Sequence, residues 1–417
     1  MFLFSELRAQ TYFPPIVGNN WESVSLAELG WCEDQLPELI SFLESNNTKA
    51  FLVLKHGRIV IEQYFGTFTQ DSLWYWASAG KTLTAYLVGK AQETGQLSIN
   101  EISSTYLGNG WTNCTVDQES AITIRNQLTM TTGLDDGGSD EFCTLPSCLN
   151  YLAPAGSRWA YHNAPYTLLD GVLEGSTGQT MNGLAFAWLK QPTGMDGYFF
   201  QNGYNNVYLS TARSMARFGI LMQNGGNWNG SQLMTDGNYF QEMITPSQSL
   251  NNAYGYFWWL NGQSSYMVPG SQLVIPGQLF PHAPADTYAA LGKNGQLLNV
   301  SPTEDLIFVR LGNAPDNSLV PFTLNDQIWE KLNLLMCTGV SEMAFDEVSI
   351  NQTSGSLGIS WQGKDFDCVI YDISGKQVIR EFVHELKELS KENIPSGVYV
   401  VQVTRSSERI IRKVIIP

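Results

Sequence analysis

Two residues three positions apart, Ser78 and Lys81, are the strongest candidates for chemistry in this chain of 417 residues. Apolar residues follow them at helical spacing, which places both side chains on one face of a helix that begins at Ser78. A serine hydroxyl becomes a good nucleophile when a base removes its proton, and a lysine in a dry pocket can lose enough basicity to act as that base. The backbone N–H of Ser78, at the helix N-terminus, would face a carbonyl oxygen that turns anionic.

The Ser-x-x-Lys spacing alone is a weak signal, because a chain of this length contains about one such pair by chance. The competing interpretation is a serine that caps a helix and a lysine on the helix surface. Two features favour a site. Lys81 is followed by an apolar run, and the aromatic residues 74–76 can form the wall of a pocket, although such a cluster is also typical of a protein core.

Tyr161 and Asn163 form a second candidate pair, placed just before an expected helix where both side chains can enter a cleft. A tyrosinate beside a cationic lysine is stabilised by charge, so this phenol can serve as base or acid. By itself the Tyr-x-Asn triplet carries no functional information, since most such pairs are structural.

Lys293, Asn294, Gly295 and Gln296 form the third group, within residues 288–311, which are expected to form two adjacent antiparallel strands. A lysine that points inward beside the serine would attract a substrate carboxylate. The backbone N–H after Gly295 would complete an oxyanion hole. The alternative interpretation is that Lys-Asn-Gly is simply a turn.

The three groups together, in this order and on these elements, resemble the serine β-lactamase and penicillin-binding superfamily. The Tyr-x-Asn second motif is similar to that of class C β-lactamases, D-alanyl-D-alanine carboxypeptidases and related esterases. It differs from the Ser-Asp-Asn of class A. The resemblance covers residues 20–337.

The resemblance implies a covalent mechanism with an acyl-enzyme. Ser78 attacks an ester or amide carbonyl while Lys81 and Tyr161 share its proton, and water later releases the acyl group. The backbone N–H groups of Ser78 and Gln296 hold the oxyanion. Asn163 orients the substrate or Lys81.

The third group has one implied binding residue and one departure from the family pattern. Lys293 supports the tyrosine and attracts an anionic substrate, whereas Asn294 stands where β-lactamases usually have Thr or Ser. Esterases and amidases of the superfamily vary at this position. The departure therefore argues against penicillin hydrolysis more than against hydrolysis in general, and the substrate stays open among esters, peptides, β-lactams and other amides.

The predicted fold is α/β (α+β), of the β-lactamase/transpeptidase type, over a hydrolase domain at residues 12–337. An antiparallel sheet forms from a hairpin at residues 50–66 and the strands within 286–313. Helices at residues 35–46 and 325–336 cover one face of this sheet. A mostly helical region covers the other face, and the site lies between.

Residues 345–417 alternate β-rich runs with turn signals and predict a small β-sandwich after a linker at residues 338–344. The Ser-Gly-Val-Tyr-Val-Val-Gln-Val run at residues 396–403 and the basic last strand resemble the C-terminal sorting domain of the type IX secretion system of Bacteroidetes. The alternative is a carbohydrate-binding or adhesive module. The resemblance implies the type IX machinery as a partner and a secreted or cell-surface location, reached through the periplasm.

The composition limits the classes of partner. A net charge of −16 argues against nucleic acid and anionic membrane surfaces. No apolar segment is long enough to span a bilayer, and the polar but weakly charged composition is typical of an extracellular protein. Residues 1–11 are interpreted either as the end of a signal peptide or as a disordered N-terminus. The expected partner in the site is a small ester, amide or peptide, without a cofactor.

Cys143 and Cys148 are spaced to close a small disulfide loop, as expected in an oxidising compartment. The other four cysteines and the four histidines show no metal-ligand spacing, so no metal site is predicted. The acidic stretch at residues 134–141 is predicted to be a solvated loop, with calcium binding as the alternative.

Two other functional classes remain as alternatives. A Ser-His-Asp hydrolase would need His162 or His282 as its base, and the chain has no Gly-x-Ser-x-Gly elbow. A binding protein that keeps the penicillin-recognising fold without catalysis is the other alternative, and the presence of all three motif groups speaks against it.

Overall fold

A computed structural model describes residues 11–138, 140–314 and 320–337 and the following C-terminal segments: 348–352, 356–361, 365–372, 376–384, 386–390, 397–405 and 408–416. The chain divides into two compact units, residues 1–336 and 337–417. Residues 1–10 and the predicted linker at 338–344 lie outside the described residues. Each unit is described by itself.

The first unit is built on a six-stranded antiparallel sheet with the strand order β2-β1-β13-β12-β11-β8, which confirms the predicted sheet. The predicted hairpin is present, and His56 and Gly57 form its turn with φ angles of 51° and 76°. The edge strand β8 was not predicted because it is only two residues long. The strands are β1 Thr48–Lys55, β2 Arg58–Tyr64, β8 Trp259–Leu260, β11 Tyr288–Gly292, β12 Gln296–Ser301 and β13 Leu306–Gly312.

The expectation of two strands within residues 288–311 is wrong, because the structure has three. Asn294 and Gly295 adopt left-handed φ angles of 65° and 78°, so Lys293–Gly295 turns the chain between β11 and β12. Asn and Gly are the residues that tolerate this conformation in tight hairpins. The third motif group is therefore a turn at the end of a hairpin.

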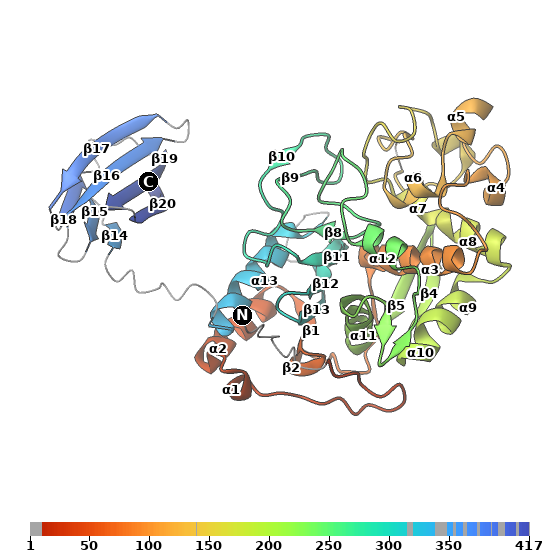
Figure 1. The fold of residues 1–417 in the computed structure, drawn as a ribbon, viewed down its shortest axis with the longest axis horizontal. Coiled ribbons are helices and arrows are strands. Elements are labelled where there is room, and N and C mark those ends of the chain that lie inside the picture. Colours follow the sequence, from red (N-terminus) through yellow and green to blue (C-terminus); the bar gives the residue numbers. More distant parts are fainter. Residues whose placement is uncertain are drawn as a thin grey trace, which may run out of the picture. The chain divides into compact units, whose positions relative to one another are not determined.

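Helices cover both faces of the sheet, as predicted (Figure 1). The terminal helices α2 (Leu36–Ser45) and α13 (Phe322–Leu335) pack together on one face. Helix α11 (Ala212–Gln223) packs on β1, β12 and β13 from the other face. Close packing there requires Gly219, since a Cβ at this position would lie 2.8 Å from a methyl carbon of Ile307.

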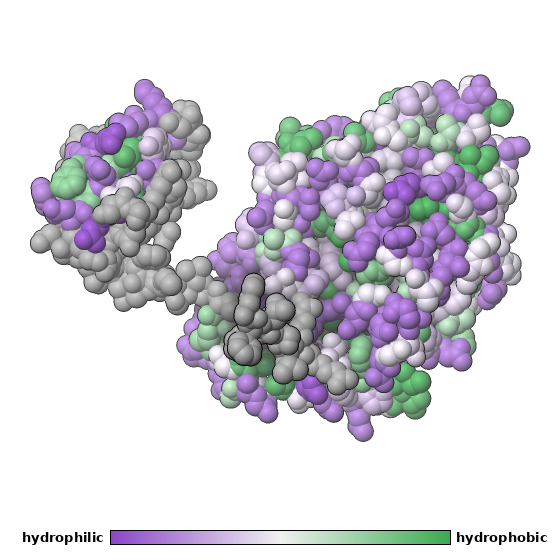
Figure 2. All heavy atoms as spheres, viewed as in Figure 1, coloured by the Kyte–Doolittle hydropathy of each residue, from purple (hydrophilic) through white to green (hydrophobic). Residues whose placement is uncertain are grey.

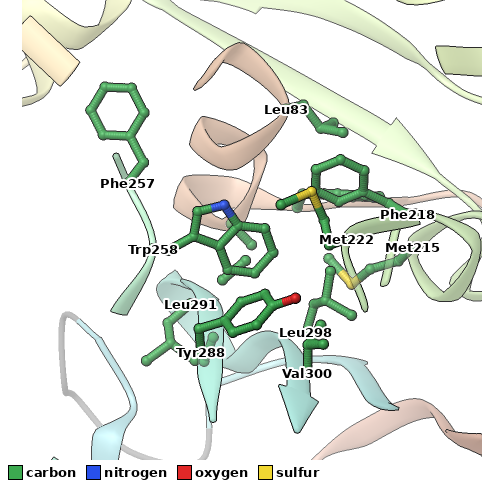
Figure 3. Packing of buried hydrophobic residues seen from close by; sticks show 14 of the residues in the cluster. Leu83, Met215, Phe218, Met222, Phe257, Trp258, Tyr288, Leu291, Leu298 and Val300 are labelled. Carbon is green, nitrogen blue, oxygen red and sulfur yellow. The ribbon is translucent and has the colours of Figure 1, made fainter. Parts of the chain in front are cut away.

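Figure 3 shows the core between this second face and the helices, where Leu83, Phe218 and Trp258 lie close together. The Phe218 and Trp258 rings are stacked with centroids 6.0 Å apart, and the Trp258 ring meets Tyr288 of β11 edge-on at 5.1 Å. Leu83 belongs to α3 (Lys81–Glu93), a helix buried along most of its length. This packing fixes α3, and with it the residues at its N-terminus, against the sheet.

A mostly helical region and a small second sheet complete the first unit. The sequence from residue 122 predicts a helix that ends at residues 132–133. The structure has a shorter helix here, which Thr123 caps and which ends at Leu128. The small sheet has the order β3-β5-β4, formed by Trp74–Tyr75, Asn205–Ser210 and Tyr198–Asn202. The other helices and turns are α1 Leu26–Leu29, η1 Glu33–Gln35, η2 Ala77–Gly80, α4 Ser104–Leu107, α5 Val116–Ser120, α6 Ile124–Leu128, η3 Pro146–Cys148, α7 Asn163–Thr167, α8 Leu169–Thr177, α9 Met181–Ala185, η4 Phe186–Lys190, α10 Gln191–Thr193 and α12 Gly237–Met243. Two short strand pairs are β6 Asn227–Trp228 with β7 Ser231–Gln232, and β9 Ser265–Tyr266 with β10 Ile275–Pro276.

The second unit contains two antiparallel sheets, with strand orders β14-β15-β18 and β17-β16-β19-β20. Ile359 of the first sheet and Phe366, Ile370 and Val401 of the second belong to one buried apolar cluster, as expected for a small β-sandwich. The strands are β14 Val348–Gln352, β15 Ser356–Trp361, β16 Phe366–Asp372, β17 Gln377–Val383, β18 Leu386–Ser390, β19 Gly397–Arg405 and β20 Glu408–Ile416.

The face of the first unit that Figure 2 shows carries many hydrophilic residues, interrupted by small apolar patches. Within the described residues, none of the helices has the length and apolar character needed to cross a membrane.

Candidate active site

Ser78 lies in a tight turn at the N-terminus of α3. The predicted helix is present, but residues 77–80 form a 3-10 turn and the α-helix begins at Lys81. Ala77, the residue before the serine, has a φ of 47°, a conformation that a residue with a side chain rarely adopts. The turn is held by a hydrogen bond from Trp76 N to Tyr208 O of 2.8 Å. Strain of this kind persists where the surroundings over-determine it, and it is typical of functional sites.

The spacing of Ser78 and Lys81 brings their side chains together as predicted. Lys81 Nζ donates a hydrogen bond of 2.9 Å to Ser78 Oγ. Burial lowers the pKa of Lys81 to about 7, although the nearby Glu141 carboxylate raises it. The Lys81 ammonium also lies 4.4 Å from the centroid of the Tyr166 ring, which can stabilise it while it is charged. Lys81 can therefore exist as a free amine near neutral pH, next to a serine hydroxyl.

Tyr161 joins the same group through a hydrogen bond to the Ser78 side chain. Burial raises the pKa of Tyr161, the bond to Ser78 lowers it, and the negative charge of Glu141 raises it, with burial as the largest effect. Of the two roles that the sequence allows for this phenol, base or acid, burial therefore favours the acid. In this buried position a phenolate would lose its favourable hydration free energy, and attraction to a partly neutral lysine is too weak to offset that loss. Tyr161 is therefore a protonated phenol.

Asn163 begins α7 two residues after the tyrosine, and its side chain contacts a residue that the sequence did not single out. Asn163 Nδ2 donates a hydrogen bond of 3.1 Å to Glu141 Oε2. Glu141 lines the same cavity as Ser78, and its charge acts on both Lys81 and Tyr161. The acidic stretch that contains it was predicted to be a solvated loop, so the prediction is wrong for this residue.

The sequence signal that could have identified Glu141 is its position close to the disulfide, two residues before Cys143. Cys143 and Cys148 are joined, as predicted, and the bond anchors the loop just after Glu141. Elsewhere in the acidic loop, Asp136 forms an ion pair of 2.7 Å with Arg158. Across the part of the chain that the structure describes, there is no cluster of three or more metal-ligating side chains.

The other cysteines differ in state. Cys32 and Cys337 are also disulfide-bonded, which the sequence analysis did not predict. The backbone N–H of Cys32 donates to Leu335 O at the end of α13, at 2.8 Å. Cys114 is a free thiol, and Cys368 is buried and is not part of a disulfide.

The third motif group divides between the cavity and the sheet. Lys293 lines the cavity with Ser78. Gly295 is buried against the sheet, where a Cβ would lie 2.1 Å from Arg310 Nη1. The Gln296 side chain is also turned into the sheet and donates a bond of 2.8 Å to Gly312 O. The structure thus brings Lys293 to the site, while Gly295 and the Gln296 side chain support the hairpin.

A neighbouring glycine, Gly292, packs closely on the tight turn that contains Ser78. A Cβ on Gly292 would lie 2.3 Å from Trp76 O and 3.0 Å from Ala79 N. Gly292 pairs with Gln296 across the hairpin, so the backbone at the end of this hairpin is held against the residues on both sides of Ser78. This glycine is not part of the Lys-Asn-Gly motif. A glycine is required here because the two backbones are too close to leave room for a Cβ.

These groups surround a cavity of about 600 Å³, a volume suited to a small organic ligand. One part of its wall is apolar or aromatic, and another part carries side-chain amides. The apolar and aromatic residues include Leu73, Trp74, Tyr75, Phe142, Phe200 and Val207, and the amides are Asn163, Asn202, Asn205 and Asn206.

Neither histidine proposed for a Ser-His-Asp arrangement lies in this cavity. The His282 ring hydrogen-bonds Asp326 at 2.8 Å on an exposed surface. His162 is buried, and burial lowers its pKa to about 4. The partner that Ser78 has within reach is a lysine, so the Ser-His-Asp alternative lacks a base.

A Ser-Lys pair with a tyrosine, in a cavity beside a helix-covered antiparallel sheet, defines a serine hydrolase of the penicillin-recognising class. The family model described as Beta-lactamase matches residues 47–332, and the chain belongs to the β-lactamase family. A second model, the secretion system C-terminal sorting domain, matches residues 351–417. The chain therefore carries a type IX sorting domain, which supports a secreted or cell-surface location.

Three proteins similar in sequence or structure are named as hydrolases or as a putative β-lactamase. The 6-aminohexanoate-dimer hydrolase of Paenarthrobacter ureafaciens is 22% identical over 68% of this chain and 76% of its own length. A solved putative 6-aminohexanoate-dimer hydrolase from Bacillus anthracis has a TM-score of 0.59 at 18% identity, covering 75% of this chain and 87% of that one. A putative β-lactamase from Bacteroides dorei DSM 17855 has a TM-score of 0.58 at 15% identity, covering 74% of this chain and 99% of that one. At these identities the structures show a shared fold.

Proposed function

We propose that this protein hydrolyses a small ester or amide through a covalent acyl-enzyme on Ser78. The observation that carries the proposal is the hydrogen bond of 2.9 Å between Lys81 Nζ and Ser78 Oγ, with the pKa of Lys81 lowered to about 7. A buried, partly neutral amine in contact with a serine hydroxyl is the arrangement that nucleophilic catalysis requires.

Acylation begins when Lys81 accepts the proton of Ser78 and the serine oxygen bonds to the substrate carbonyl carbon. Tyr161, a neutral phenol bonded to Ser78, passes a proton toward the leaving alkoxide or amine and is reprotonated by Lys81. The bond from the carbonyl carbon to the leaving group then breaks. Water attacks the resulting ester by the reverse proton path and restores free Ser78.

The backbone supplies the charge stabilisation in this proposal. The N–H groups of Ser78 and Gln296 hold the oxyanion, and the close packing of Gly292 on the nucleophile turn keeps the two segments together. Asn163, held by Glu141, orients the substrate or Lys81. Lys293, at the cavity wall, supports Tyr161 and attracts an anionic part of the substrate.

The substrate class is proposed to be a small ester or amide more than a β-lactam, because Asn294 replaces the usual Thr or Ser. A relative whose name describes hydrolysis of the 6-aminohexanoate dimer favours inclusion of linear amides. The cavity of about 600 Å³ is consistent with a substrate of that size. The sorting domain leads us to propose export through the periplasm by the type IX machinery.

A fluorophosphonate probe tests the nucleophile, because it labels only an activated serine. Wild-type protein, Ser78→Ala and the matched surface variant Ser120→Ala are treated alike, and the labelled peptide is identified by mass spectrometry. We expect labelling at Ser78 in the wild type and in Ser120→Ala, and none in Ser78→Ala. A panel of p-nitrophenyl esters, a chromogenic β-lactam, D-alanyl-D-alanine peptides and the 6-aminohexanoate dimer then ranks the substrates. Absence of both labelling and hydrolysis would favour the non-catalytic binding protein.

A further inference from the structure

Tyr75 presents a phenol to the cavity three residues before the nucleophile. It belongs to β3, pairs with Leu209 of β5, and lines the cavity that contains Ser78. Asn294 Nδ2 donates a hydrogen bond of 2.6 Å to Tyr75 Oη. Asn294 does not itself line the cavity. At this position a ligand would therefore meet the Tyr75 hydroxyl, which Asn294 holds in place.

A buried arginine holds the turn that contains Asn294 through hydrogen bonds. Arg310 of β13 is fully buried, and its guanidinium donates to Gly295 O at 2.6 Å and to Asn294 O at 3.2 Å. Its Nε donates to Thr48 Oγ1 at 2.9 Å. These bonds hold the turn rigidly, and the left-handed φ of 65° at Asn294 favours Asn over a β-branched residue such as Thr. The Tyr75 hydroxyl is therefore held in one place before any substrate arrives.

Because Asn294 is the donor in this hydrogen bond, the hydroxyl proton of Tyr75 is still available for donation. The amide of Asn294 occupies a lone pair of the phenolic oxygen, so Tyr75 keeps its own O–H as a donor. Within the described residues, no side chain or carbonyl accepts that O–H. A donor that lines a cavity without a protein acceptor is suited to an acceptor on the ligand.

We propose that Tyr75, oriented by Asn294, donates a hydrogen bond to an oxygen of the substrate's acyl portion. Lys81 and Tyr161, which handle the proton of the leaving group, lie on α3 and just before α7, on the helical side of the cavity. Tyr75 is held by Asn294 of the turn between β11 and β12, so the proposal assigns it to the acyl portion and not to the leaving group. The site thus selects acyl groups that carry a carbonyl oxygen near the scissile bond. This inference rests on the proposed function and adds a substrate class to it.

The test compares two p-nitrophenyl esters of similar length. The N-acetylglycyl ester has a carbonyl acceptor in its acyl chain, and the pentanoyl ester has none. The measured quantity is the specificity ratio, kcat/KM for the first ester divided by kcat/KM for the second. For Tyr75→Phe we expect this ratio to fall about tenfold relative to wild type, the loss typical of one hydrogen bond. The surface variant Tyr151→Phe is the matched control and should leave the ratio unchanged.

A second variant separates recognition from structural support. Asn294→Asp keeps the size of the side chain and tolerates the left-handed backbone, but its carboxylate accepts the Tyr75 proton that the substrate would otherwise receive. We expect Asn294→Asp to lower the specificity ratio like Tyr75→Phe, although the tyrosine and its hydrogen bond to residue 294 are retained. In the Tyr75→Phe background the same change should lower the ratio no further.

Two results would overturn the inference: an equal loss on both esters in Tyr75→Phe, or a wild-type specificity ratio in Asn294→Asp. Either result leaves the proposed function intact as long as wild-type protein hydrolyses these esters. Failure of the proposed function looks different, since wild type would then hydrolyse neither ester and Ser78 would resist the fluorophosphonate probe.

Discussion

The two units of the chain differ in what they bury. The first unit buries ionisable side chains, including Lys81 and Arg310, beside a cavity and a strained turn. The buried side chains that the structure describes in the second unit, such as Ile359, Phe366 and Val401, are apolar or aromatic. Burial of an ionisable group opposes folding by several kcal/mol unless it is well bonded, so a protein retains such groups mainly where they have a function.

The difference teaches that chemistry and delivery belong to different parts of the chain. A large core can tolerate strain and buried charge, because it buries a larger fraction of its surface than a small domain does. The second unit, residues 337–417, is a small domain, and its described residues form an apolar cluster; a sorting-domain model matches residues 351–417. Catalysis and export should therefore be separable by mutation.

The largest effect is expected from removal of the nucleophile. Ser78→Ala should lower kcat by at least about 10⁴-fold and abolish covalent labelling, because Ser78 forms the acyl-enzyme in the proposed mechanism. The fold should survive, since one oxygen is lost in a cavity, and thermal unfolding and secretion should match wild type. Hydrolysis or labelling by purified Ser78→Ala at the wild-type rate would contradict the assignment.

The reciprocal change removes the second unit. A variant that ends at residue 340 keeps the disulfide-bonded Cys337 and all the candidate site residues. It should hydrolyse substrate like the full chain, and in a host with a type IX system it should accumulate in the periplasm. Fractionation with activity assays measures both. A truncated protein that is well folded but inactive would show instead that the second unit contributes to substrate binding or regulation.

Lys81→Ala and Tyr161→Phe should each lower acylation about 10²- to 10⁴-fold, because each interrupts the proton path from Ser78. The double variant should lose less than the product of the two single effects, since both residues serve one transfer. Single-turnover labelling rates measure this step. Losses that multiply fully would indicate that the two residues act independently.

A pH profile tests the charge of Glu141. The kcat/KM of wild type should rise with pH through about 7, as Lys81 loses its proton and becomes the free base. The Glu141 carboxylate raises the pKa of Lys81, so Glu141→Gln should move this acidic limb to lower pH. Asp140→Asn, an exposed neighbour on the same loop, is the matched control and should leave the limb in place. A shift to higher pH in Glu141→Gln would contradict the interpretation.

The smallest effect is expected from the disulfide beside this loop. Replacement of Cys143 and Cys148 by Ser should lower the free energy of unfolding by about 2 kcal/mol, the value expected for a short closed loop. It should also lower kcat/KM modestly, because Glu141 is then held less firmly. Denaturant unfolding and kinetics measure both, with Cys114→Ser, at a free thiol, as the control. Equal destabilisation by Cys114→Ser would contradict a specific stabilising role of the Cys143–Cys148 disulfide.

The sequence by itself determined the features that depend on near neighbours along the chain. The Ser78–Lys81 contact follows from helical spacing, and the turn at His56 and Gly57 follows from the residues that form it. The sheet and its covering helices were predictable because their apolar positions recur with the period of a strand or a helix. The paired cysteines at 143 and 148 were predictable for the same local reason.

Only the tertiary structure decided the features that depend on segments far apart in sequence. Glu141 approaches Asn163 across 22 residues, and Asn294 holds Tyr75 across 219 residues. The neutral state of Tyr161 depends on burial by many elements, which no local motif encodes. Periodicity in a sequence reports which face of an element is buried. It does not report which distant polar group meets which, because that depends on how whole elements pack and on the desolvation that packing imposes.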